Sequence, residues 1–268
     1  MEKLLKEYFN SKHIDHYAVL SYTDCIEINP HIIEREGFTP KSVILFLLPY
    51  YVIKPANISA YAASYDYHIA IREITDGLVE VIKGAFPDAN MKGYGDHSPI
   101  NEVHAALISG LGLIGDNGLL INEEYGTYIF IGDLVTDIDP DILGATSPSE
   151  VRGCYHCGAC KAACPTGVLL GKSDQCLSAI TQKKGDLDDQ EVSLMRKYNT
   201  VWGCDMCQSV CPYNKNPKIT PIEFFHRDLI LRLDSDLLSA MDKDCFNKRA
   251  FAWRGRKTVQ RNLTLLDF

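Results

Sequence analysis

Apolar residues in the N-terminal half follow two spacings, and these spacings predict the first elements. Residues 42–48 are apolar at successive positions, which is typical of a central strand, and Pro49 ends the run. Between 66 and 85, apolar residues recur every three or four positions, which predicts a helix. Similar patterns predict helices over 2–13 and 101–111 and strands over 17–22, 118–122 and 127–135. Strands mixed with helices indicate an α+β fold.

The composition adds a concentration of cysteine to this picture. The chain has 268 residues, of which 46% are hydrophobic and 23% charged, as in ordinary globular proteins. Eight of its ten cysteines lie between Cys154 and Cys211. The N-terminus has no apolar signal segment, and no apolar run approaches the roughly 20 residues that cross a bilayer. We therefore expect a cytoplasmic protein with no membrane partner, whose thiolates are free to bind metal.

The formal charge of −8 hides a division along the chain. Residues 1–150 carry 9 basic and 22 acidic side chains, and residues 151–268 carry 18 and 13. Residues 243–261 are the most basic stretch, with aromatic residues interleaved. This pattern predicts either a phosphate-facing surface for nucleic acid or a solvated helical face whose aromatic residues point inward.

A stretch rich in Asp, Pro, Ser and Gly over 138–150 is typical of a linker. We expect an N-terminal α/β domain over 1–143, a cysteine-rich domain over 144–220 and a short helical, basic segment over 221–268.

The cysteine spacing predicts two iron–sulfur clusters. Cys154-x2-Cys157-x2-Cys160-x3-Cys164-Pro is the bacterial ferredoxin pattern, in which the fourth cysteine binds the other cluster. A second Cys-x2-Cys-x3-Cys-Pro element follows at 204–212. One [4Fe–4S] site is assigned Cys154, Cys157, Cys160 and Cys211, and the other Cys164, Cys176, Cys204 and Cys207. Paired structural zinc sites are the alternative, although zinc does not account for the repeated Cys-Pro element.

Two clusters imply electron transfer, but a ferredoxin needs far fewer residues than this chain has. The long segment ahead of the clusters therefore predicts a second cofactor or a substrate site. Cys25 and Cys245 have no cysteine neighbour in the sequence and are expected to be small core residues.

Beyond the cysteines, the chain resembles the epoxyqueuosine reductase family from about Ser42 to Leu266. The resemblance is carried by several segments: Tyr61 to His68, Asp96-His97-Ser98-Pro99, Gly110 to Asn122, Phe130 to Asp137, Cys176-Leu177-Ser178, Gly203 to Pro212 and Arg261-Asn262-Leu263. It implies a corrinoid-binding N-terminal domain, a ferredoxin-like double-cluster domain and a cobalamin held between them.

The resemblance also implies roles for single residues. Asp96 falls on the proton donor that serves the departing epoxide oxygen, and Tyr67 and His68 help to shape the pocket. Positions that contact the corrinoid are Ser59, Asn117, Leu120 and Ser178. The implied partners are an external low-potential electron donor and a tRNA that carries epoxyqueuosine and meets the basic C-terminal segment.

Two positions depart from the family pattern. Val103 stands where members carry a basic residue, and Asp116 stands where they commonly have Lys. The chain is also shorter than typical members, and a paralogue with another substrate is therefore a second expectation. Two alternatives follow: a corrinoid-dependent reductase of a small molecule, or an electron-transfer iron–sulfur protein without corrinoid.

Overall fold

The computed structural model describes residues 1–146 and 153–267. Packing divides the described chain into unit 1, residues 1–49 and 68–155, and unit 2, residues 50–67 and 156–268. Residues 50–67 thus belong with the C-terminal part of the chain, and residues 221–267 pack together with the cysteine-rich segment. The three domains 1–143, 144–220 and 221–268 stay a prediction, and part of the expected linker, 147–150, lies outside the described residues.

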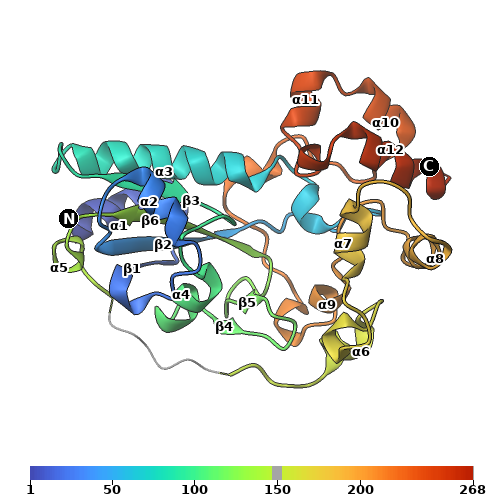
Figure 1. Ribbon diagram of the computed structural model, residues 1–268, viewed down its shortest axis with the longest axis horizontal. Coiled ribbons are helices and arrows are strands. Elements are labelled where there is room, and N and C mark those ends of the chain that lie inside the picture. Colours follow the sequence, from blue (N-terminus) through green and yellow to red (C-terminus); the bar gives the residue numbers. More distant parts are fainter. Residues whose placement is uncertain (147–152, 268) are drawn as a thin grey trace. The chain divides into compact units, whose positions relative to one another are not determined.

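Unit 1 is built on a four-stranded antiparallel sheet of order β1-β2-β6-β3 (Figure 1). The predicted central strand is β2 (Ser42–Pro49), whose eight residues are all buried. It pairs with β1 (Tyr17–Ser21) on one side and with β6 (Ile129–Thr136) on the other. An inner strand covered on both faces needs apolar residues at every position, which explains the uninterrupted run.

Helices cover both faces of this sheet. Phe9 of α1 (Glu2–Ser11) has its ring 5.6 Å from that of Phe46, and α3 (Tyr67–Lys83) lies beside α1. The opposite face of β2, with Val43 and Leu45, packs against α2 (Pro30–Glu36) and α4 (Glu102–Ile108). Because side chains alternate along β2, the strand contributes to a hydrophobic core on each face of the sheet.

Several elements of unit 1 differ from the sequence expectation. The helix α2 and the edge strand β3 (Met91–Tyr94) are not evident in the apolar pattern. The strand expected over 118–122 is only β5 (Leu120–Ile121), paired with β4 (Leu113–Ile114). A short helix, α5 (Pro140–Leu143), follows the sheet.

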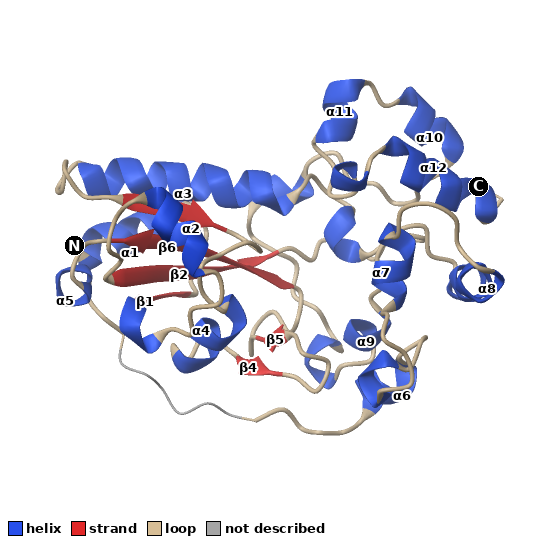
Figure 2. Cartoon of the chain, in the orientation of Figure 1, coloured by secondary structure: helices blue, strands red, loops and turns tan. Residues whose placement is uncertain are grey.

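Unit 2 consists of short helices and connecting turns (Figure 2). Its larger core surrounds Trp202, which is fully buried and brings together residues 58–62 and the C-terminal helices. The helices are α6 (Ala159–Ala163), α7 (Leu177–Gln182), α8 (Asp189–Tyr198), α9 (Met206–Ser209), α10 (Ser235–Ala240), α11 (Lys243–Asn247) and α12 (Arg256–Leu265). None of the described helices is long and apolar enough to span a membrane.

Candidate functional site

The cysteines of the predicted cluster sites sit at the ends of short helices. Cys160 lies in α6 and Cys164 at its C-terminal end, while Cys176 precedes α7 and Cys207 lies in α9. Helices α6 and α9 pack against each other in unit 2. None of the ten cysteines is in a disulfide, and most are partly buried, so that their thiols can serve as metal ligands.

Three of the thiols assigned to one cluster share an environment in unit 2. Burial raises the pKa of Cys204 to about 12, and the nearby Cys176 and Cys207 thiols add to the rise because their charges would repel. Grouped thiols that resist ionisation by themselves suit a cation, because the metal supplies the charge that stabilises all of them. Three cysteines of the predicted ligand set thus lie near one another, and the full set stays a prediction.

Cys164 is set apart by its hydrogen bonds. Burial alone raises its pKa, but backbone N–H groups of Leu169, Thr166 and Gly167 and the Thr166 hydroxyl favour the thiolate, so that the net pKa is lowered. Such N–H donors to sulfur are among the contacts that tune iron–sulfur clusters. The structure thus prepares this cysteine as an anionic ligand.

The partly buried carboxylate of Asp205 forms hydrogen bonds that connect residues 50–67 to the cysteine-rich segment. The Ser59 hydroxyl donates to Asp205, the Ala60 N–H donates to its other oxygen at 2.6 Å, and the Gln208 amide donates at 3.1 Å. Gly203 adopts a φ of +75°, and a Cβ there would lie 2.5 Å from that of Ser59. Glycine is therefore required beside Cys204 both for its conformation and for this close approach.

The residues expected to contact a corrinoid differ in what they offer. The Ser59 hydroxyl is used by Asp205, and Leu120 is 4% exposed in the core of unit 1. Asn117 in unit 1 and Ser178 in unit 2 are partly exposed polar residues. Ser59 lines a cavity of about 100 Å³ within unit 2, smaller than the 300–1,000 Å³ of typical ligand sites. A corrinoid does not fit inside this cavity. Asn117 and Ser178 offer partly exposed polar side chains, although the first accepts the Leu119 N–H and the second accepts from the Gln182 amide.

Asp96 lies on the loop after β3 and has a left-handed φ of +65°. Its side chain is exposed to solvent. Its backbone N–H donates to Oε1 of Glu102, in the first turn of α4, at 3.2 Å. Two further acidic residues, Glu102 and Asp133, are less exposed than Asp96.

Two carboxyl groups lie beneath the Asp96 loop and were not predicted from the sequence. Burial raises the pKa of Glu102 to about 9, with a further rise from the charge of Asp133. Asp133, on β6, is completely buried, and this raises its pKa to about 7, while contacts with Ser98 and Glu102 offset only part of the effect. A single acidic residue within the apolar strand 129–135 is the sequence signal for this pair.

The two departures from the family pattern lie in unit 1. Val103 packs partly buried against the core rather than presenting a charge. Asp116 lies between β4 and β5 and is partly exposed. Cys25 and Cys245 each pack, partly buried, against a core cluster, as expected.

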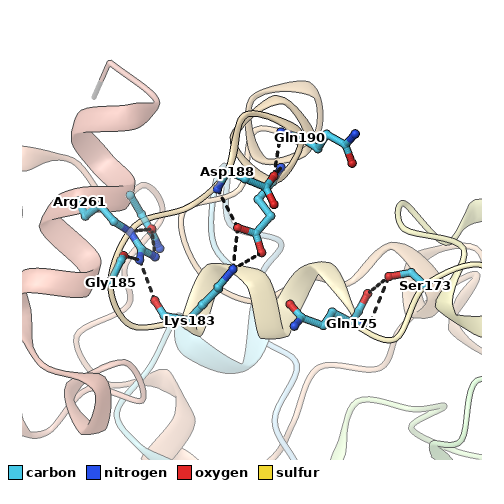
Figure 3. Close-up of polar contacts among 9 residues, drawn as sticks. Ser173, Gln175, Lys183, Gly185, Asp188, Gln190 and Arg261 are labelled. Atoms are coloured by element: carbon cyan, nitrogen blue, oxygen red, sulfur yellow. Dashed lines mark hydrogen bonds and ion pairs between the residues drawn. The ribbon is translucent and has the colours of Figure 1, made fainter.

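The basic segment 243–261 is only partly open to a ligand. Arg261 donates to the carbonyls of Lys183, at 2.7 Å, and Gly185 (Figure 3). Arg256 donates to the carbonyls of Leu238 and Met241. Arg249 donates to the Asp228 carbonyl. Residues whose side chains remain exposed are Lys243, Lys248, Trp253 and Lys257.

Comparison with known proteins agrees with these observations. The 4Fe-4S double cluster binding domain family matches residues 153–214, which include all eight clustered cysteines. Epoxyqueuosine reductase of Listeria monocytogenes is 32% identical over 265 residues, covering 89% of this chain and 66% of that protein. The enzyme of Aliivibrio fischeri is 36% identical over 194 residues, covering 70% and 50%. This chain belongs to the epoxyqueuosine reductase family.

Solved epoxyqueuosine reductases have the same fold. A selenomethionine-labelled enzyme gives a TM-score of 0.77 at 23% identity, covering 99% of this chain and 80% of that one. A complex with an epoxyqueuosine-modified tRNA-Tyr stem loop gives 0.76 at 24% identity with the same coverage. The structural likeness thus extends to residues before Ser42. This chain spans between half and two thirds of the curated epoxyqueuosine reductases named above.

Proposed function

We propose that this protein is an iron–sulfur reductase that deoxygenates epoxyqueuosine in tRNA, with electrons delivered through two [4Fe–4S] clusters. The observation that carries the proposal is the grouping of Cys176, Cys204 and Cys207, none of them in a disulfide, within the matched double-cluster segment. The substrate is proposed from the relatives, one of which was solved with an epoxyqueuosine-modified stem loop. An external low-potential donor would supply the electrons.

Each cluster has its proposed ligands. Cys154, Cys157, Cys160 and Cys211 would hold one, and Cys164, Cys176, Cys204 and Cys207 the other. Thiolates at this spacing suit iron, and the lowered pKa of Cys164 favours the ligating form.

A cobalamin is proposed as the second cofactor because of the resemblance to the family. Asn117 and Ser178 are the residues that would offer it polar contacts, whereas Ser59 would act by holding Asp205. When bound, the corrinoid supplies a strongly reducing metal for the removal of oxygen.

Asp96 is the proposed general acid. Its carboxyl would hold a proton and deliver it to the epoxide oxygen as the C–O bond breaks, because an alkoxide is a poor leaving group without protonation.

The test uses protein reconstituted anaerobically with iron, sulfide and hydroxocobalamin. We expect corrinoid to be retained after gel filtration and queuosine to form from epoxyqueuosine-containing tRNA when a low-potential reductant is added. Asp96→Asn should retain both cofactors and lose turnover, because an amide cannot donate the proton. Full activity of Asp96→Asn would contradict the assignment of the acid.

A second candidate function is reduction of a small molecule by the same cofactors. It is favoured by Val103, whose partly buried side chain places no cation near Asp96 from that position. Retained corrinoid without turnover of the tRNA would support this alternative. Loss of all corrinoid would leave an electron-transfer protein.

A further inference from the structure

Beside the Asp96 loop, the fully buried Asp133 lies against the partly buried Glu102, an arrangement that the proposed reaction does not itself explain. Asp133 pairs across the sheet with Leu45 on β2 and Tyr94 on β3, which directs its side chain toward α4 and Glu102. It is 0% exposed. Among the residues that the structure describes, neither of its oxygens has a hydrogen-bond donor in normal geometry.

Two side chains act on Asp133, the hydroxyl of Ser98 and the carboxyl of Glu102, and the second is itself an acid. Two ionised carboxylates in contact in a dry environment repel, and neither can donate a hydrogen bond. One proton shared by the pair removes both difficulties, since a protonated Glu102 donates to Asp133 through one oxygen. Its other oxygen, Oε1, still accepts the Asp96 N–H at 3.2 Å.

Burial of Asp133 and the charge of Asp96, which acts on Glu102, favour retention of that proton. Charged groups on the neighbouring elements act on Cys25 and Tyr94 beside the pair: Asp24 after β1, and Glu36 and Arg35 in α2. The Tyr94 hydroxyl, also buried, has no hydrogen-bond partner within the described residues.

We propose that Glu102 and Asp133 are positioning residues that share one proton and thereby hold the Asp96 loop in its left-handed conformation. The proposal rests on the proposed function, in which Asp96 is the acid. The pair transfers no proton to substrate, and it fixes the backbone of Asp96. Loss of the shared proton leaves two carboxylates that repel, which displaces Glu102 from Asp133 and releases the loop even though the ionised Glu102 can still accept the Asp96 N–H. The loop should therefore loosen at alkaline pH.

The variants separate a shared proton from simple packing. Glu102→Gln imitates the protonated acid, because its carbonyl can accept the Asp96 N–H while its NH₂ group donates to Asp133. Glu102→Ala removes both bonds and leaves Asp133 buried without its neighbour. Glu73→Gln, on the exposed face of α3, is the matched control.

The first readout needs neither cofactor nor substrate: amide hydrogen exchange of peptides covering 93–100, compared between variants at the same pH. At pH 7 we expect wild type and Glu102→Gln to exchange alike, and Glu102→Ala about tenfold faster because the loop opens. At pH 10 wild type should approach Glu102→Ala while Glu102→Gln stays slow. Infrared spectra of wild type at pH 7 should also contain a protonated-carboxyl band that Glu102→Gln lacks.

Exchange in wild type and Glu102→Gln that stays equal from pH 7 to 10, or the absence of the infrared band, would overturn the proposal. If Glu102→Ala does not fold, Asp133→Asn decides the matter, because it removes the pair's charge and should abolish the alkaline loosening. In loaded enzyme, Glu102→Ala should lower kcat with little change in KM, and Glu102→Gln should restore it. An inactive wild type with the expected exchange pattern would refute the proposed function and leave the carboxyl pair supported.

Discussion

At the residue scale, the cysteines were the most predictable part of the site and the buried acids the least. Thiolate ligands must follow a fixed spacing to reach one cluster, so their positions can be predicted from the sequence alone. The partnership of Glu102 and Asp133 depends instead on strand register and on the placement of α4, which no local pattern contains. Asp96 was found only through the family resemblance.

The assignment of Cys176 to a single cluster makes a direct prediction. Cys176→Ser should lower the iron content of reconstituted protein by about half, because one of two clusters loses a ligand. Cys245→Ser is the control, since Cys245 packs against a core cluster and should leave the iron content unchanged. Equal iron in both variants would refute the ligand set.

The raised pKa values of Glu102 and Asp133 predict how stability depends on pH. Their ordinary values are 4.5 and 3.8, and in the fold they rise to about 9 and about 7. The native state therefore binds more protons than the unfolded state between about pH 4 and 9, and stability falls as pH rises through this range. Glu102→Gln should remove part of this slope, on the order of a few kcal/mol at pH 9 relative to pH 5. Denaturant unfolding at both pH values measures it, and an unchanged slope would contradict the shifts.

At the element scale, long apolar patterns predicted β2, α3 and β6 well, because burial alone determines them. The edge strand β3 was missed because it has no apolar residue at Gly93. A side chain does not fit there, since a Cβ would lie 2.4 Å from that of Thr75 on α3. The short helices of unit 2 were missed for another reason. Their positions follow from the cysteine loops and the Trp202 core rather than from periodicity.

Arg256 illustrates how a basic residue can belong to the fold rather than to a ligand site. It joins the start of α12 to the end of α10 through the carbonyls of Leu238 and Met241. Arg256→Ala should lower the free energy of unfolding by about 1–3 kcal/mol, because buried carbonyls lose a charged donor. Lys257→Ala, its exposed neighbour, should change it by less than about 0.5 kcal/mol. Thermal or denaturant unfolding distinguishes the two.

If the basic segment meets tRNA as the family resemblance implies, its exposed lysines are the residues that would contact the RNA. Replacing Lys248 and Lys257 together by Ala should weaken tRNA binding and make log Kd less dependent on log salt, by roughly one unit of slope or more. Lys3→Ala with Lys83→Ala, on exposed positions of α1 and α3, is the charge-matched control. An unchanged salt slope in the Lys248/Lys257 variant would place the RNA elsewhere.

At the scale of the whole molecule, the mixed helix and sheet fold and the double-cluster segment were anticipated from the sequence. The grouping of residues 50–67 with the C-terminal part was not, because it depends on buried contacts far apart in sequence, such as the two hydrogen bonds between Asn57 and Leu233. Unit 2 therefore contains the cysteine-rich segment, the hydrogen bond between Ser59 and Asp205, and the C-terminal helices.

The most direct test of the central claim is the nucleoside content of tRNA in a host that lacks its own epoxyqueuosine reductase and expresses this chain. The account predicts that epoxyqueuosine is replaced by queuosine, and that neither Asp96→Asn nor Cys204→Ser achieves this. Undiminished epoxyqueuosine in cells that accumulate iron-loaded protein would contradict it.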